Sequence, residues 1–259
     1  MKLTINPPLS LHNIGKRANN EDNVFPPKGT ATVENNLFII ADGIGGLHNG
    51  EVASRVVCEA FSEFLQQAFD GFDAEMFQQA LEYAYYQSYA SDTEDEPRKM
   101  GTTLALLRLH SGGAFMAHIG DSRIYHLRPD GRGDCTILYR SQDQSFVAEL
   151  LAAGVISEKE ARQHPQRNVL TRAIITRTIQ PCQSRVDADI KETADVQPGD
   201  YFFLCSDGVL ESIDDYALCK IMGATDTDAE KMRKIERICI ENSNDNFSAY
   251  LISIAAVEA

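Results

Sequence analysis

Residues 37–46, LFIIADGIGG, run from five apolar positions directly into an aspartate, followed by three glycines within four residues. The apolar run is short and bounded by turn-forming residues, which predicts a buried β-strand over 36–42. A carboxylate at the end of a buried strand loses hydration and needs a compensating partner. Similar junctions recur at Asp207 in FFLCSDGV and at Asp121 in FMAHIGDSRIY. A fold for this chain therefore has to accommodate several acids at strand ends.

The bulk composition indicates a globular protein and excludes some functions. The 259 residues are 43% hydrophobic and 24% charged, enough for one large domain or two small ones. The sequence contains neither an apolar run of the roughly 20 residues that span a bilayer nor the apolar core of a signal peptide. We therefore expect a cytoplasmic protein without membrane association. The net charge of -14 argues against a nucleic-acid partner, which favours a basic surface.

The cysteines and histidines do not form a recognisable metal or disulfide pattern. The sequence has six of each, dispersed, without a C-x-x-C pair or an H-x-x-x-H spacing. Reduced thiols are the usual state in a cytosolic chain of this size. The spacing disfavours zinc as well.

The order of apolar patterns favours layered α+β architecture. Strands cluster in blocks and helices come in pairs, unlike the alternation of βαβ units. Three neighbouring strands, separated by SGG and GDS, predict an antiparallel meander over 102–127. The other expected elements are helices over 50–69 and 74–90, two short helices within 143–165, a strand over 201–207, helices to about 241, and a final strand over 247–257.

Four acids lie at the ends of these expected elements, Asp42, Asp121, Asp207 and Asp245, and two more, Glu21 and Asp22, lie in the loop-rich N-terminal segment. If the strands share sheets, several of these carboxylates converge on one edge. They would then repel and raise one another's pKa values unless a cation neutralised them. Hard oxygen ligands without histidine or thiolate suit Mg²⁺ or Mn²⁺. The glycines that follow Asp42 and Asp207 allow tight turns and let a carbonyl approach an ion.

Two such ions, about 3.5–4 Å apart, can hold a bridging hydroxide and clamp a phosphoryl oxygen. Arg17, four residues before Glu21, supplies the planar donor fork that suits a phosphate dianion. Each motif is weak by itself, since a D-G pair is usually a turn and a single arginine is usually a surface charge. The ordered set carries the interpretation.

The ordered set resembles the metal-dependent protein phosphatases, the protein phosphatase 2C-like (PPM) family, in their compact bacterial form. The resemblance covers residues 17–246, nearly the whole chain. Its motifs, in order, are R-x-x-N-E-D (17–22), A-D-G-I-G-G (41–46), G-E-V-A-S (50–54), G-T-T (101–103), G-D-S-R (120–123), D-Q-S (143–145), L-T-R-A (170–173), S-D-G (206–208) and N-D-N (244–246).

The resemblance implies a fold and a domain organisation. The expected fold is a four-layer α/β/β/α sandwich, in which two mainly antiparallel sheets are flanked by helix pairs. We expect a single catalytic domain over 1–259. A flap segment over about 141–180 would lie near the active site and help to choose substrates.

The resemblance also implies roles for individual residues. Asp42 would bridge two ions, with the Gly43 carbonyl on one of them and Asp207 and Asp245 on the other. Asp121 would bind a weaker third ion, with Glu211 as its nearest support. Glu21 and Asp22 would hold metal-bound waters, and Arg17 would bind the substrate phosphate. Thr102, Thr103 and Ser122 would serve packing and turn geometry.

Four positions depart from the family pattern. Ile44 stands where some members carry a histidine suggested as the acid for the leaving group, so water would have to supply that proton. Gln144 replaces the usual histidine of D-H-S at the start of the flap. Ile174 and Ile175 follow L-T-R-A where glycine is common, and Glu211 stands in place of an aspartate.

The implied function is a protein serine/threonine phosphatase in which a hydroxide bridging two Mn²⁺ or Mg²⁺ ions attacks phosphorus. Its partners would be phosphorylated proteins, including a cognate serine/threonine kinase and its substrates, and the protein would be a monomer. The alternative is a non-catalytic pseudophosphatase that binds phosphoproteins or regulators. A metal-dependent phosphodiesterase or nuclease shares the two-metal chemistry, but the charge balance and motif order disfavour it.

Overall fold

The computed structural model describes residues 2–44, 49–66, 72–91, 100–175 and 186–258. Two antiparallel sheets form its centre. The first sheet has the order β1 (Lys2–Ile5), β13 (Phe247–Glu258), β12 (Tyr201–Cys205), β8 (Arg123–Pro129) and β9 (Cys135–Arg140), and β2 (Leu9–Asn13) also pairs with β13. The second has the order β11 (Asp189–Thr193), β7 (Gly113–Ile119), β6 (Leu104–His110), β4 (Leu37–Asp42) and β3 (Asp22–Phe25).

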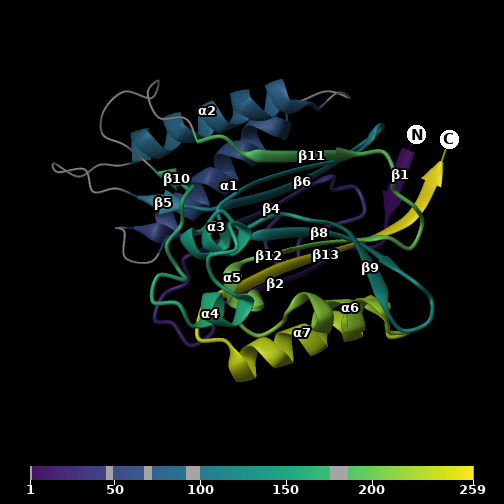
Figure 1. The fold of residues 1–259 in the computed structure, drawn as a ribbon. Helices are drawn as coiled ribbons and strands as arrows, with labels where there is room; N and C mark the ends of the chain where they lie inside the picture. The colour runs from purple at the N-terminus through teal and green to yellow at the C-terminus, as the bar shows by residue number, and fades with distance from the viewer. Residues whose placement is uncertain (1, 45–48, 67–71, 92–99, 176–185, 259) are drawn as a thin grey trace.

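Helices cover the outer face of each sheet (Figure 1). The helices α1 (Gly50–Gln66) and α2 (Ala74–Ser91) lie over the second sheet. The helices α6 (Asp215–Gly223) and α7 (Asp228–Asn242), with the short α5 (Asp207–Leu210), lie over the first. The expected α+β fold, a four-layer α/β/β/α sandwich, is confirmed.

The continuous apolar run of β4 follows from burial on both faces of its strand. Phe38 and Ile40 belong to the cluster between the sheets, whereas Ile39 and Ala41 belong to the cluster beneath α1 and α2. Side chains of a strand alternate between its faces, so a strand covered on both sides is apolar at every position. The same alternation puts Asp42 on the inter-sheet face, at the end where the apolar layer stops.

The predicted meander over 102–127 is wrong in one respect. β6 and β7 pair with each other, but β7 belongs to the second sheet and β8 to the first. Residues 120–122 therefore form a crossover between sheets instead of a hairpin turn. Gly120 begins this crossover with a φ of 99°, a left-handed conformation that favours glycine. The crossover carries Asp121 to the same edge as the end of β4.

The expected flap contains α3 (Phe146–Ala152), α4 (Glu158–Gln163) and β10 (Ile174–Ile175), which pairs with β5 (Gly101–Thr102). Its last expected residues, 176–180, lie outside the described part of the chain. The two predicted short helices are confirmed, with a break at Gly154, whose φ is 70°. The other helices and strands expected from the sequence are also present, although the last expected residues of the first helix, 67–69, lie outside the described part of the chain.

Candidate active site

The carboxylates expected to converge do so at the end of the two sheets. Asp22 and Asp42 are direct partners across β3 and β4. Asp207 comes from the other sheet, two residues after β12, and its carboxyl group lies beside that of Asp42, close enough for each to shift the pKa of the other. Two carboxylates this close repel each other unless a proton or a cation neutralises them. The stacking of the sheets thus brings together acids that are 165 positions apart in the sequence (207 − 42).

The pKa values of the clustered acids rise above their ordinary range. Lost hydration, followed by the charges of Asp207 and Asp245, raises the pKa of Asp22 to about 7. Lost hydration and the Asp245 charge raise the pKa of Asp207 to about 6. Lost hydration also raises the pKa values of Asp42 and Asp121 well above the ordinary value. Such crowding indicates a site suited to a cation.

The backbone around Asp42 is held by the threonines of the G-T-T motif. The Asp42 amide donates to Thr103 Oγ1 at 3.0 Å, and Thr102 Oγ1 donates to the Asp42 carbonyl at 2.8 Å. Thr103 Oγ1 also lies 2.7 Å from Ser122 Oγ, beside Asp121. These contacts support the predicted structural role of Thr102, Thr103 and Ser122.

Gly43 is positioned by its neighbours on both sides. Its amide donates to the Glu21 carbonyl at 3.0 Å, and the residue bridges to Thr102. The Ile44 amide then donates to the Gly101 carbonyl at 2.9 Å. The apolar Ile44 side chain, which cannot donate a proton, thus lies two residues after Asp42.

Asp22 is the most enclosed of the acids, with 2% of its surface exposed. Ser206 Oγ donates to Asp22 Oδ2 at 2.8 Å, and the hydroxyl of Ser248 also lies beside the carboxyl group, where both serines act to lower the pKa of Asp22. These hydroxyl groups offset part of the cost of burying the carboxyl group.

Arg17 lies at the open side of the cluster. Its Nη2 donates to Asp245 Oδ2 at 2.6 Å, and the two side chains are 51% and 23% exposed. Glu21, whose backbone amide binds Asn246 Oδ1 at 2.9 Å, is half-buried nearby. Lost hydration and the Glu51 charge raise the pKa of Glu21.

Glu211 has a defined contact that differs from its predicted role. Its Oε2 accepts hydrogen bonds from the Asn244 amide at 2.9 Å and from Ser243 Oγ at 3.3 Å. The carboxylate thus holds the loop that presents Asp245. The structure therefore gives Glu211 a positioning contact, and the predicted support of a third ion stays a prediction.

Two residues of the site were not predicted, although both lie inside quoted motifs. Ser206 binds Asp22 and also accepts the Ser248 amide at 3.0 Å. Asn246 Nδ2 donates to the carbonyls of Ile14 and Asn19 at 2.8 and 2.9 Å. Their position next to Asp207 and Asp245 was the available signal. Their contacts, however, depend on strands that are distant in the sequence.

The donor set fits Mg²⁺ or Mn²⁺, because it consists of carboxylates and backbone carbonyls. Among the described residues, no three acidic, histidine or cysteine side chains are grouped as a ready metal site. Mg²⁺ is usually held by one or two carboxylates, with waters completing its shell. The Asp42–Asp207 pair is compatible with this mode of binding.

The fold and the acidic edge define the class of protein to which the chain belongs. The family model for protein phosphatase 2C matches residues 12–236, so the chain is a member of the protein phosphatase 2C (PPM) family. The family expected from the motifs is thereby confirmed.

Curated relatives bear names consistent with this family. The chain is 31% identical over 250 residues to protein phosphatase PhpP of Streptococcus pneumoniae serotype 2, covering 94% of this chain and 95% of that protein. It is 31% identical over 240 residues to serine/threonine protein phosphatase PstP of Mycobacterium tuberculosis. That match covers 92% of this chain but 43% of PstP.

Solved structures share the fold. The crystal structure of PstP from M. tuberculosis matches with a TM-score of 0.78 and 28% identity, covering 98% of this chain and 100% of that one. A structure of the PstP catalytic domain in complex with two manganese ions matches with a TM-score of 0.77 and 25% identity, with the same coverage. These likenesses place the chain among bacterial serine/threonine phosphatase structures.

Proposed function

We propose that this protein is a metal-dependent phosphatase that hydrolyses phosphoserine and phosphothreonine monoesters on proteins. The observation that carries the proposal is the contact between Asp42 and Asp207, which joins strand ends of two sheets into one acidic site. The names of PhpP and PstP support the class of substrate. The manganese complex of PstP supports the class of cofactor.

Asp42, the Gly43 carbonyl, Asp207 and Asp245 are the proposed ligands of two Mn²⁺ or Mg²⁺ ions, and Asp121 of a weaker third. Bound there, the ions would activate a water for attack on phosphorus and neutralise charge on the phosphate. Glu21 and Asp22 would orient water beside the ligands. For Asp22 this role is supported by its pairing with Asp42 across β3 and β4.

Arg17 is the proposed binder of the substrate phosphate. Its guanidinium is half exposed and lies beside Asp245 at the open side of the acidic site, where an incoming dianion would meet it. Planar donor forks match phosphate oxygens well. An incoming phosphate would thus replace Asp245 as the ion-pair partner of Arg17.

The wider setting is also proposed. No described helix has both the length and the apolar character needed to cross a bilayer. We propose a cytoplasmic monomer that acts on the substrates of a cognate serine/threonine kinase. The flap, which lies beside the site through β10 and β5, would contact the protein part of the substrate.

The test is dephosphorylation of phosphoserine and phosphothreonine peptides with Mn²⁺, with Mg²⁺ and with EDTA. Asp42→Asn removes charge at the proposed bridge, so turnover of p-nitrophenyl phosphate should fall more than about 100-fold, beyond the usual effect of residues that only support ligands. Asp195→Asn, at an exposed carboxylate elsewhere, should keep wild-type turnover.

Two outcomes would contradict the proposal. Wild-type turnover in Asp42→Asn, or activity in EDTA, would remove the metal assignment. Phosphopeptide binding without hydrolysis under every metal condition would instead indicate the pseudophosphatase, the alternative that the apolar Ile44 suggests.

A further inference from the structure

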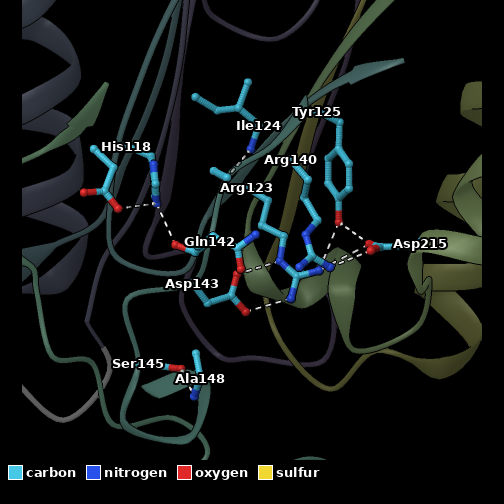
Figure 2. A network of polar contacts seen from close by, with 12 residues as sticks. His118, Arg123, Ile124, Tyr125, Arg140, Gln142, Asp143, Ser145, Ala148 and Asp215 are labelled. Carbon is cyan, nitrogen blue, oxygen red and sulfur yellow. Dashed lines mark hydrogen bonds and ion pairs between the residues drawn. The ribbon is translucent and has the colours of Figure 1, made fainter. Parts of the chain in front are cut away.

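The first residues of the flap, 141–144, are bound one after another to the segment that carries Asp121. The Ser141 amide donates to the Ile124 carbonyl at 3.0 Å, and the Ile124 amide donates to Ser141 Oγ at 2.9 Å. His118 Nε2 lies 2.7 Å from the Gln142 carbonyl (Figure 2). We call residues 141–144 and 118–124 together the flap anchor.

Asp143 and Arg123 form the strongest contact of the flap anchor. Arg123 Nε donates to Asp143 Oδ1 at 2.6 Å and Nη2 donates to Oδ2 at 2.7 Å, a two-point pairing (Figure 2). Burial lowers the pKa of Arg123, but hydrogen bonding and charge from Asp143 give a net rise, so the guanidinium stays charged. Its Nη1 also donates to Tyr125 Oη at 3.0 Å. Such forked pairs fix orientation as well as distance.

Gln144 contacts the residue directly before Asp121. The Gly120 amide donates to Gln144 Oε1 at 2.9 Å, and the Gln144 amide donates to the Gly120 carbonyl at 3.0 Å. Gln144 is 6% exposed, so these bonds are shielded from water. Gly120 in turn packs on Thr103, since a Cβ there would lie 2.7 Å from Thr103 Cγ2.

A later part of the described flap, residues 169–171, returns to the same anchor. The Thr171 amide donates to the Gln144 carbonyl at 2.9 Å, and the Phe146 amide donates to the Val169 carbonyl at 2.8 Å. Ser145 caps α3 by accepting the Ala148 amide. The described flap is therefore a closed loop whose base is attached on both sides of Asp121.

We propose that Arg123 and Gln144 are positioning residues that fix the segment 120–123, and with it the place of Asp121 at the acidic site, so that the flap base and the acidic site form one unit. The proposal rests on the proposed function. Asp121 lies in the three-residue crossover between β7 and β8, outside the strands, so the contacts of its neighbours Gly120 and Arg123 determine its position. Residues that support ligands commonly determine metal affinity in this way.

The experiment compares Arg123→Lys and Asp143→Asn with the matched control Arg128→Lys. Lysine keeps the charge but loses the fork. Arg128 lies on the same strand, β8, and forms an equivalent two-point pair with Asp200, with Nε and Nη2 at 2.7 and 2.9 Å from its oxygens. Calorimetric titration with Mn²⁺ and the Mn²⁺ dependence of p-nitrophenyl phosphate turnover are both measured, together with Tm.

We expect Arg123→Lys and Asp143→Asn each to weaken Mn²⁺ binding roughly tenfold. Their double variant should be no worse than Arg123→Lys alone, because Asp143→Asn removes a contact that Arg123→Lys already breaks. Arg128→Lys should lower Tm about as much as Arg123→Lys does, but should leave Mn²⁺ binding unchanged. Gln144→Ala removes the side-chain acceptor of the Gly120 amide and should also weaken Mn²⁺ binding.

Unchanged Mn²⁺ binding in Arg123→Lys and Asp143→Asn, or an equal loss in Arg128→Lys, would overturn the proposal. If the wild-type protein binds Mn²⁺ but hydrolyses nothing, the proposed function fails and calorimetry still decides the role of the anchor. If it binds no ion, amide exchange at residues 120–122 decides: exchange faster than wild type in Arg123→Lys, but not in Arg128→Lys, supports the anchor. Equal exchange in both variants rejects it.

Discussion

The glycines that follow Asp42 and Asp207 are needed for close packing of the backbone. Neither Gly43 nor Gly208 has a positive φ. A Cβ on Gly43 would lie 2.4 Å from the Gly50 carbonyl carbon, and one on Gly208 would lie 1.9 Å from the Asn246 carbonyl oxygen. The D-G pairs thus let neighbouring chain segments approach the acidic site, which differs from the turn freedom expected from the sequence.

Gly208→Ala tests this packing. Alanine in a helix is favoured over glycine by about 1 kcal/mol, so α5 alone would gain stability. Overpacking against a backbone atom costs about 1–3 kcal/mol, so we expect a net loss in the free energy of unfolding by urea. Turnover of p-nitrophenyl phosphate should also fall, because the new methyl group would displace Asn246, the neighbour of the proposed ligand Asp245.

Gly112→Ala is the control for the same substitution. The new Cβ would meet only the His110 ring, 2.9 Å away, and a side chain can move aside. We expect a smaller change in stability than for Gly208→Ala. Equal effects at the two positions would show that backbone contact at Gly208 is not the cause.

At the scale of elements, periodicity located the strands, but their distribution between sheets followed from contacts that the sequence does not display. β7 and β8 are joined by three residues, a length typical of a hairpin, yet they belong to different sheets. Both are largely buried, so neither shows the one-sided alternation that would mark a pairing face. The sheet exchange could therefore not be predicted from local pattern.

Two helices with the same cap provide a prediction at this scale. Thr227 with Glu230 on α7, and Ser157 with Glu160 on α4, form reciprocal capping boxes. Thr227→Ala should lower the free energy of global unfolding by about 1 kcal/mol, because α7 packs into a core. Ser157→Ala should leave global unfolding unchanged and speed amide exchange only within α4, which is mostly exposed.

Urea unfolding and amide exchange of the two variants check this difference. Glu230→Gln and Glu160→Gln, which keep a hydrogen-bonding side chain, should have smaller effects than the alanine variants. An equal loss of global stability in Ser157→Ala would show that α4 is part of the cooperative core.

For the whole molecule, the sequence predicted the convergence of acids but not the residues that hold them. Strand ends were sufficient to predict the place of Asp42 and Asp207 in the site, and the order of the motifs was sufficient for Asp22. The contacts of Glu211 and Ser206 depend on how the N-D-N loop and β13 pack beside the site. Such contacts arise only when the sheets stack, so single-sequence reasoning could not supply them.

Stacking also buries a second charged cluster, around Asp200, which is 1% exposed. Arg128 binds both of its oxygens, and His126 Nε2 lies 2.9 Å from Oδ2. Burial raises the pKa of Asp200, but the hydrogen bonds from Arg128 and His126 outweigh it and lower the pKa to about 2. The ionised carboxylate is therefore a stabilising part of the fold.

The pH dependence of stability follows from this lowered pKa. A carboxyl group that titrates near 2 when folded and near 3.8 when unfolded contributes about 2 kcal/mol above pH 4. This contribution is lost as the pH falls through about 2, because the unfolded chain binds the proton first.

Asp200→Asn should therefore lower the urea-derived free energy of unfolding by about 2 kcal/mol at pH 7, and by progressively less between pH 4 and pH 2. Asp195→Asn, which removes an exposed partner of Arg128, should change the urea midpoint little at any pH. A deficit in Asp200→Asn that stayed constant down to pH 2 would assign the loss to packing and not to the carboxylate charge.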